Sequence, residues 1–324
     1  MVHAIRFHKA GGPEVLEWED VQVGKPGQGE ARVRHTAIGL NYVDTYVRSG
    51  LYPAALPSGL GAEAAGIVEE VGPGVTDIKA GDRVAYGNSP LGAYSEARVM
   101  PAHRLIVLPK GITDQQGAAM MLKGLTAQYL IRQIFKVKKG DTILWHAAAG
   151  GVGLIACQWA KSLGATVIGT VGSDEKAKLA KSHGCDHVII YTREDFVERV
   201  KELTKGEKVP VVYDSVGKDT FMKSLDCIRP HGLMCNFGQA SGPIGPVDLG
   251  IFGQKGSLFY TRPTLGTYAA KREDMVAMAD DLFKAVTSGA VKIEVNQTYP
   301  LKDAAQAHRD LQSRKTTGST VFTV

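Results

Sequence analysis

The stretch Trp145-His146-Ala147-Ala148-Ala149-Gly150-Gly151-Val152-Gly153-Leu154 carries the strongest fold signal in this chain. It follows the apolar run 142–145 and opens an apolar-periodic stretch that continues to Leu163. This order predicts a strand, a glycine turn and a helix, where a doubly wound fold binds the pyrophosphate of a dinucleotide. Glycines let the backbone approach the phosphates, and the helix N-terminus stabilises their charge. Because Ala148 replaces the first glycine of the usual motif, an ordinary tight turn is the alternative.

Strands and amphipathic helices alternate after this turn. The expected strands are 166–171, 188–191, 209–213 and 233–237, and the expected helices are 174–181, 194–203 and 220–228. This alternation predicts a parallel sheet with right-handed crossover connections. Together with the glycine turn, it predicts a Rossmann nucleotide-binding domain.

The end of the second strand, 166–171, indicates which cofactor is bound. Domains that bind NAD usually place Asp or Glu there to hold the ribose 2′-hydroxyl group. Here Gly172 and Ser173 follow the strand, and Lys176 lies one turn into the next helix. The missing carboxylate removes repulsion toward a 2′-phosphate, while Lys176 supplies a cation and Ser173 a hydroxyl group. The pattern favours NADPH, and a solvated surface position for Lys176 is the alternative.

Residues 1 to about 100 have a different character. They are rich in glycine, valine and turn signals, with short strands expected at 30–37, 65–71 and 82–86. This composition predicts a mostly antiparallel β domain. The tail contains a helix pattern at 272–287, a strand at 291–299, a helix at 302–313 and a strand at 320–324. We expect the tail to complete the first domain, giving one domain of residues 1–124 and 266–324 and a second of residues 125–265.

Composition limits the partners and the compartment. The net charge of +5 is spread along the chain, and no aromatic-interleaved basic stripe indicates a nucleic-acid groove, so nucleic acid is not expected as the main partner. No apolar run reaches transmembrane length, and no signal-peptide core is visible, so we expect a cytoplasmic protein without membrane association. The cysteines form no Cys-x-x-Cys pair, which disfavours zinc-ribbon and disulfide frameworks; they are Cys157, Cys185, Cys227 and Cys235.

Several ordered motifs resemble the medium-chain dehydrogenase/reductase superfamily: Gly61-Ala62-Glu63-Ala64-Ala65-Gly66, Val71-Gly72 and Gly81-Asp82-Arg83-Val84. Within it, the chain is most similar to the zinc-free quinone oxidoreductases of the zeta-crystallin type. The matching motifs are Asn41-Tyr42-Val43-Asp44-Thr45-Tyr46, Arg48-Ser49-Gly50-Leu51-Tyr52-Pro53, Lys123-Gly124-Leu125-Thr126, His146 to Gly153, Tyr213-Asp214-Ser215-Val216-Gly217 and Asn236-Phe237-Gly238. This resemblance covers essentially the whole chain. It implies an α/β protein with a GroES-like, mostly antiparallel β catalytic domain and a Rossmann domain that binds NADPH.

The residues that hold catalytic zinc in the related alcohol dehydrogenases are replaced in this chain. The resemblance puts Asn41, Ala62 and about Leu122 at the positions of the Cys, His and Cys ligands. Amide, methyl and isobutyl groups do not replace thiolate and imidazole ligands. Asp44 and Glu63 remain, but two carboxylates are not a zinc site. We therefore expect no metal, and we expect Glu63 to pair with a nearby cation or backbone group.

A site without a metal suits a conjugated acceptor such as a quinone or enone, because the anion formed on reduction is delocalised. The protein must then align the nicotinamide with the acceptor and offer donors to its carbonyl. We expect Asn41 and Lys123 to be these donors and Tyr46 and Tyr52 to be stacking or hydroxyl-donating walls. The resemblance implies that Thr126 contacts the nicotinamide. Plain packing of the tyrosines and a buried ion pair of Lys123 are the alternatives.

The resemblance also implies a set of NADPH contacts. They are Asn41, Tyr129, Ala149, Gly150, Gly151, Val152, Gly153, Gly172, Ser173, Lys176, Tyr191, Ser215, Phe237, Gly238 and Arg314. Spacing alone does not select Tyr129 or Arg314, and a surface position is the alternative for Arg314. We interpret His146 as a buried, hydrogen-bonded histidine rather than as a general acid.

Three functions are compatible with this sequence. The leading hypothesis is NADPH-dependent reduction of quinones, by hydride or by single electrons. The nearest alternative is NADPH-dependent reduction of 2-alkenals or enones. The third is a non-catalytic protein that binds nucleotides or RNA. The expected strand 258–260 lies near the edge of the Rossmann sheet and predicts a homodimer formed by edge pairing, which the resemblance supports.

Overall fold

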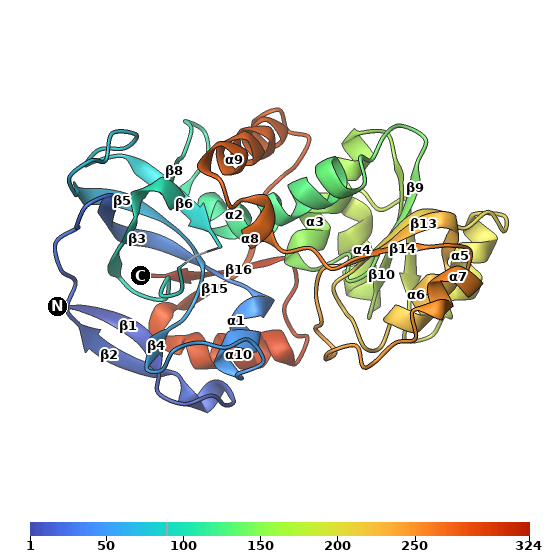
Figure 1. Cartoon of the computed structure of the whole chain (residues 1–324), viewed down its shortest axis with the longest axis horizontal. Coiled ribbons are helices and arrows are strands. Elements are labelled where there is room, and N and C mark those ends of the chain that lie inside the picture. Colours follow the sequence, from blue (N-terminus) through green and yellow to red (C-terminus); the bar gives the residue numbers. More distant parts are fainter. Residues whose placement is uncertain (89) are drawn as a thin grey trace. The chain divides into compact units, whose positions relative to one another are not determined.

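The computed structural model describes residues 1–88 and 90–324, which form two compact units. The first unit contains Met1–Leu125, Ala269–Thr287 and Ile293–Val324. The second unit contains Thr126–Tyr268 and Ser288–Lys292. Most of the C-terminal tail therefore belongs to the same unit as the N-terminal residues (Figure 1).

Two sheets form the framework of the first unit. The larger sheet has the strand order β15-β16-β3-β5-β6-β8, with β7 paired to β3, and the smaller has the order β2-β1-β4. The strands of the larger sheet are β3 (Glu30–Leu40), β5 (Glu63–Val71), β6 (Arg83–Gly87), β7 (Ala97–Pro101), β8 (Ile106–Val107), β15 (Val295–Pro300) and β16 (Ser319–Thr323). Those of the smaller sheet are β1 (Val2–Phe7), β2 (Glu17–Val21) and β4 (Ser58–Gly59). β16 pairs antiparallel with β3, so a strand near residue 320 lies beside one that starts at Glu30.

The helices of the first unit pack around these sheets. They are α1 (Tyr42–Arg48), α2 (Asp114–Gln128, which crosses into the second unit after Leu125), α9 (Arg272–Thr287) and α10 (Ala304–Gln312), with short turns η1 (Pro13–Val15), η2 (Ala102–Arg104) and η4 (Leu301–Asp303). A buried cluster that includes Ile5, Val33, Tyr86 and Phe322 forms the core. The core therefore unites residues from both ends of the chain.

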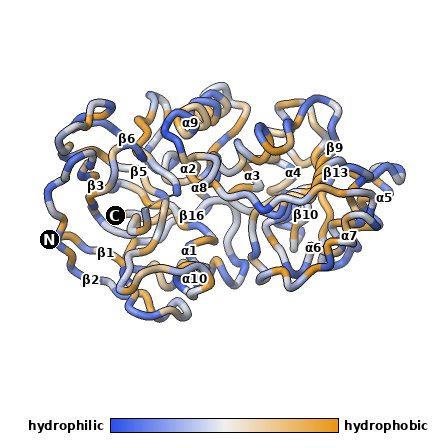
Figure 2. The backbone as a smooth tube through the Cα atoms, in the orientation of Figure 1, coloured by the Kyte–Doolittle hydropathy of each residue, from blue (hydrophilic) through white to orange (hydrophobic). Residues whose placement is uncertain are grey.

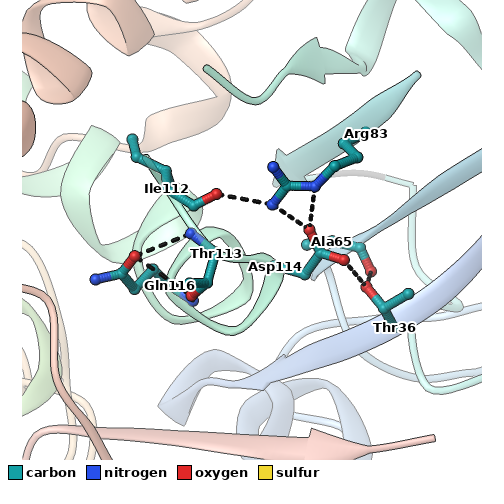
Figure 3. A network of polar contacts seen from close by, with 7 residues as sticks. All are labelled: Thr36, Ala65, Arg83, Ile112, Thr113, Asp114 and Gln116. Carbon is teal, nitrogen blue, oxygen red and sulfur yellow. Dashed lines mark hydrogen bonds and ion pairs between the residues drawn. The ribbon is translucent and has the colours of Figure 1, made fainter. Parts of the chain in front are cut away.

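Helix α2 begins at a polar network that fixes it to the large sheet (Figure 3). The backbone N–H of Gln116 donates to Thr113 Oγ1 at 3.1 Å, and Thr113 N–H donates to Gln116 Oε1 at 2.9 Å. This reciprocal pair is a capping box, which satisfies N–H groups at the helix start. Asp114 accepts hydrogen bonds from Thr36 Oγ1 on β3 at 2.8 Å and from Arg83 Nε on β6 at 2.9 Å. The sheet thus sets the position of the helix that carries Lys123.

A six-stranded parallel sheet forms the second unit, with the order β11-β10-β9-β12-β13-β14. Its strands are β9 (Thr142–Trp145), β10 (Thr166–Val171), β11 (His187–Ile190), β12 (Val209–Asp214), β13 (Ile228–Asn236) and β14 (Phe259–Thr261). Its helices are η3 (Tyr129–Ile134, π-helical), α3 (Gly151–Ser162), α4 (Asp174–Ser182), α5 (Phe196–Leu203), α6 (Phe221–Asp226), α7 (Gly250–Gln254) and α8 (Leu265–Tyr268). The alternation of strands and helices confirms the predicted α/β fold class.

The central strands of this sheet are buried. Every residue of β12 is buried, as expected where a parallel sheet is covered on both faces. Figure 2 shows apolar residues concentrated along central strands such as β9 and β13. The chain runs from β9 outward to β11 and then returns to β12 on the other side of β9. Strand order therefore reverses between β9 and β12, and ligands of such folds bind at the carboxyl ends of the strands at this point.

Candidate functional site

The carboxyl ends of the parallel strands bring together most of the residues expected to bind the cofactor. Because all six strands run in one direction, the segments that follow them lie along one edge of the sheet. These segments are 146–153 after β9, Gly172 and Ser173 after β10, Tyr191 after β11, Ser215 after β12, and Phe237 and Gly238 after β13. Residues spread over nearly a hundred positions of sequence therefore share one edge.

The turn after β9 is shaped for close approach of a ligand to the backbone. Ala147 adopts a positive φ of 55°, and Gly150 N–H donates to Ala147 O at 2.9 Å. A Cβ atom on Gly153 would lie 2.6 Å from the carbonyl oxygens of Ala147 and Ala148, so only glycine fits there. Helix α3 begins directly after Gly150, which as a glycine offers no capping side chain. The first-turn N–H groups of α3 are thus available in the arrangement that binds phosphate.

The turn after β10 combines a hydroxyl group, a cation and a tyrosine. Ser173 caps helix α4, and its Oγ accepts a hydrogen bond from the backbone N–H of Lys176 at 3.3 Å. Lys176 is half-buried in the first turn of that helix. A Cβ atom on Gly172 would lie 2.8 Å from the Tyr191 hydroxyl oxygen, so this hydroxyl reaches the turn. The structure therefore brings all four predicted residues together.

The carboxylate of Asp174 beside this turn is neutralised. Arg193 donates to its two oxygens from two nitrogens, at 2.7 and 2.9 Å. This hydrogen-bonded pairing lowers the pKa of Asp174. Because a guanidinium group engages both oxygens, the carboxylate repels a nearby phosphate less than a free one would. The turn after β10 is therefore compatible with a 2′-phosphate.

The turns after β12 and β13 hold each other in place. Asp214 is fully buried and accepts hydrogen bonds from Val216 N–H at 2.7 Å and Thr220 Oγ1 at 2.8 Å. A Cβ atom on Gly238 would lie 2.6 Å from Ser215 O, so the two turns pack backbone against backbone. Asp214 fixes the turn that carries Ser215, and sequence reasoning gave it no role. The signal for it was a carboxylate at the end of a wholly apolar strand.

Arg262 was also missed by the sequence analysis. It directly follows the edge strand β14, and its guanidinium group donates to Asn236 O at 3.2 Å. Asn236 in turn donates from Nδ2 to Gly238 O at 3.0 Å. Arg262 therefore places a half-buried cation at the same edge of the sheet, next to the segment that carries Phe237.

Tyr129 and Thr126 lie together at the start of the second unit. The Tyr129 ring stacks on Tyr268, with 4.6 Å between centroids and 7° between planes. Burial raises the pKa of Tyr129, whereas a hydrogen bond with the Thr126 side chain acts in the opposite direction. His146 is buried between Thr170 Oγ1 and Ser224 Oγ, each 2.9 Å away. Its interpretation as a hydrogen-bonded core histidine is therefore confirmed.

The first unit contains a buried polar cluster around Glu63. Its Oε2 accepts hydrogen bonds from Asn41 Nδ2 at 2.8 Å and Lys123 Nζ at 2.7 Å, and its Oε1 accepts one from Leu122 N–H at 2.7 Å. The side chain of Lys123 is 5% exposed and that of Glu63 is fully buried. A Cβ atom on Gly39 would lie 2.3 Å from Glu63 Oε2, so glycine makes room for the carboxylate. The expected pairing of Glu63 is confirmed, and Lys123 forms the ion pair that the sequence left open.

Aromatic rings lie on and beside helix α1. Tyr46 and Tyr52 are half-buried, with ring centroids 5.3 Å apart at 62°, and Tyr42 contacts Tyr46 edge to face. Arg314 is exposed just after α10, and its charge opposes the burial that raises the pKa of Tyr42. The charge of Arg314 thus acts on Tyr42, an interaction that sequence spacing did not reveal.

The ligand atoms in this cluster do not suit a transition metal. The three positions discussed above carry an amide, a methyl group and an isobutyl group, and both Glu63 oxygens are engaged. Within residues 1–88 and 90–324, the one grouping of three possible metal-ligating side chains is His8, Glu17 and Glu19, which shares no residue with the cluster. Across the same residues, no helix combines the length and apolarity needed to cross a membrane.

Two family models match the chain. Residues 27–110 match the alcohol dehydrogenase GroES-like domain, and residues 151–284 match the family described as zinc-binding dehydrogenase. The first match lies within the first unit, and the second match lies mainly within the second unit.

Similar proteins cover the whole chain. It is 59% identical over 323 residues to a quinone oxidoreductase of Pseudomonas aeruginosa and 50% identical over 332 residues to a 2-haloacrylate reductase of a Burkholderia species; in both comparisons 99% of each protein is covered. The crystal structure of an Escherichia coli quinone oxidoreductase complexed with NADPH matches with a TM-score of 0.98 and 53% identity. That match covers 99% of this chain and 100% of the other.

Proposed function

Because the chain belongs to the quinone oxidoreductases of the medium-chain dehydrogenase/reductase superfamily, we propose that it reduces quinones with NADPH. The family and fold class predicted from the sequence are confirmed. The observation that carries the proposal is the edge of the parallel sheet, where an uncapped helix N-terminus lies beside a turn built from Gly172, Ser173 and Lys176. This edge suits a dinucleotide with a 2′-phosphate.

The residues present fit NADPH, which supplies hydride to the acceptor when bound. We assign the pyrophosphate to the turn of Ala149, Gly150, Gly151, Val152 and Gly153, and the 2′-phosphate to Gly172, Ser173, Lys176 and Tyr191. The remaining contacts that we assign are Asn41, Tyr129, Ser215, Phe237, Gly238 and Arg314. The close backbone packing at Gly153 and the neutralisation of Asp174 support these assignments.

The acceptor residues that we propose are Asn41, Tyr46, Tyr52 and Lys123, with Thr126 contacting the nicotinamide. Reduction builds negative charge on the acceptor oxygen, and a donor already aligned with that oxygen stabilises it. Glu63 restrains both the Asn41 amide and the Lys123 ammonium group, so little reorganisation of these donors is needed. The half-buried tyrosine rings offer flat apolar walls to a planar quinone.

A second candidate function is reduction of an activated carbon–carbon double bond. The 50% identity to a 2-haloacrylate reductase favours it, because a haloacrylate is an alkene conjugated to a carboxylate. Both reactions add hydride to a conjugated acceptor and need no metal. They differ in whether the protein stabilises a quinone oxygen or a carboxylate group.

We also propose a homodimer in the cytoplasm. The edge strand β14 exposes 63% of Phe259 and 43% of Tyr260, and an exposed apolar edge strand is a template for pairing with a second copy. The four cysteines are free and buried, which suits a reducing compartment. Sedimentation at micromolar concentration tests the dimer, and a monomer alone would contradict it.

The function is tested with a panel of acceptors. Oxidation of NADPH and NADH is followed under nitrogen with 1,2-naphthoquinone, a 2-alkenal and a 2-haloacrylate, with and without a chelator. We expect the quinone with NADPH to give the highest kcat/KM, unchanged by the chelator. Activity that requires tightly bound zinc would overturn the metal-free site, and turnover of the haloacrylate alone would favour the second candidate.

A further inference from the structure

Asp44 is a buried carboxyl group to which the proposed mechanism gives no role. It lies on helix α1 and is fully buried. Its Oδ2 accepts hydrogen bonds from Asn41 N–H at 2.9 Å and from the Tyr94 hydroxyl group at 2.8 Å. Among the residues that the structure describes, its Oδ1 has no hydrogen-bond partner. A buried anionic oxygen without a partner is costly, whereas a protonated one is much less so.

A chain of donors fixes which oxygen carries the proton. Arg48 has only donors, and its NH1 lies 2.9 Å from His308 Nδ1, so this nitrogen accepts. The proton of the neutral imidazole is then on Nε2, 3.2 Å from the Tyr94 hydroxyl oxygen. That oxygen accepts from His308 and donates to Asp44 Oδ2. Since Oδ2 receives two donors, the proton of the neutral carboxyl group belongs on Oδ1.

The protonation state of His308 is settled by its surroundings. Burial and the neighbouring Arg48 lower the pKa of His308 to about 3, so it is neutral near pH 7. Three charged or titratable groups act on Asp44 directly: Tyr94 after β6, Lys123 on α2 and Glu63 on β5. His308 on α10 contacts Tyr94, and Arg48 on the same helix as Asp44 contacts His308. His308 and Tyr94 are uncharged, so the charge beside Asp44 is set by Lys123, Glu63 and Asp44 itself.

Asp44 sets the net charge of these three buried groups. Lys123 and Glu63 form an ion pair and together carry no net charge, whereas Arg48 interacts with the charge of Glu14. With Asp44 neutral, the group of Asp44, Glu63 and Lys123 is therefore uncharged, and with Asp44 ionised it carries one negative charge. Burial raises the pKa of Asp44 to about 7; Glu63 adds to the effect, and hydrogen bonds from Asn41 and Tyr94 with the charge of Lys123 oppose it. Both states are therefore accessible near neutral pH.

We propose that Asp44 is a positioning residue for the reduction, whose protonated form keeps an additional negative charge away from Asn41 and Lys123. This inference rests on the proposed function. Transfer of hydride from NADPH to a quinone gives NADP⁺ and a hydroquinone anion, and a proton from water completes the hydroquinone. Asp44 keeps its proton during the transfer. An ionised Asp44 would repel the anion that forms on the acceptor, and protonation of Asp44 removes this repulsion.

The pH dependence of turnover tests this role. We expect kcat of the wild type with 1,2-naphthoquinone to fall about tenfold between pH 6 and pH 9, in one step centred near pH 7. In Asp44→Asn this step should be absent. In Tyr94→Phe it should move to higher pH, because the carboxylate loses a donor. Asp274→Asn, which changes an exposed carboxylate on α9, should retain the wild-type profile.

A measurement without NADPH separates failure of the inference from failure of the proposed function. The infrared carbonyl band of a protonated carboxyl group should titrate near pH 7 in the wild type and be missing from Asp44→Asn. A flat wild-type profile, or the same step in Asp44→Asn, would overturn the inference while quinone reduction stands. Absence of quinone reduction in both the wild type and Asp274→Asn would overturn the function instead. If Asp44→Asn does not fold, Tyr94→Phe and the wild-type infrared titration decide the matter.

Discussion

Replacing Lys176 with alanine should weaken NADPH binding while leaving NADH binding almost unchanged. Lys176 lies in the first turn of α4, next to the Ser173 cap and the Gly172 turn, and it is half-buried. A charge-assisted contact to a phosphate is worth roughly 1.5–3 kcal/mol when it is desolvated. Partial exposure puts the expected loss at the lower end of this range, which corresponds to about ten- to thirtyfold in Kd.

The assay is fluorescence titration of both dinucleotides at one fixed ionic strength, because salt screens exposed charges. The matched control is Lys178→Ala, which removes an exposed lysine two residues further along the same helix. Lys178→Ala should change the Kd of NADPH less than about twofold. Equal weakening of NADPH and NADH by Lys176→Ala, or equal effects of the two alanine variants on NADPH, would refute the assignment of Lys176 to the 2′-phosphate.

Three further predictions concern stability and the glycine turn. Lys123→Met should lower the free energy of unfolding at pH 7 by about 3–5 kcal/mol, because it leaves the buried Glu63 carboxylate without its cation. Urea denaturation should show a smaller loss for the double variant Lys123→Met, Glu63→Gln than for Lys123→Met alone. The pKa of Asp44 in the folded protein is raised to about 7, so the protonated side chain contributes stability that is fully present below about pH 4 and is lost as the pH rises to about 7. In thermal melts over this pH range, Asp44→Asn should therefore lose less stability than the wild type. Gly153→Ala should force the turn after β9 apart, which should lower the free energy of unfolding by about 1–3 kcal/mol and weaken the binding of both NADPH and NADH. If calorimetric titration gave the variant the same NADPH affinity as the wild type, the placement of the pyrophosphate at this turn would be contradicted.

Elements with strong apolar periodicity were predictable from the sequence almost to the residue. The strands 142–145 and 166–171 and the helix 272–287 have the same bounds in the structure, because buried strands and a long amphipathic helix leave a clear pattern. The sequence predicts a strand at 233–237, but β13 begins at Ile228, which pairs with Val209. Pro230 and Gly232, which lie between Ile228 and residue 233, are residues typical of turns, so the local sequence disfavours a strand there. Pairing with the neighbouring strand β12 nevertheless makes this segment part of β13.

The candidate site residues that lie at the strand ends could be selected from the sequence, whereas the contacts among those of the first unit could not. Turn residues such as Ser173 are recognisable because they follow a strand directly. Asn41 and Lys123 donate to the same oxygen of Glu63, although they lie 22 and 60 residues from it in the sequence. Tyr94 contacts His308, which lies 214 residues further along the chain. No local pattern encodes such contacts, since they arise only when the sheet and its helices are assembled.

The pairing of β16 with β3 also bears on the order in which the protein is made. Strand β3 emerges from the ribosome early, yet its partner is the last strand of the chain, at Ser319–Thr323. The second unit is nearly continuous in sequence, so it can fold during synthesis while the first unit still lacks β15, β16 and α10. Until β16 has been synthesised, residues 37–40 of β3 lack this partner and present unpaired backbone groups to other nascent chains. Translation that stops before residue 319 would therefore yield a folded nucleotide-binding unit attached to an aggregation-prone one.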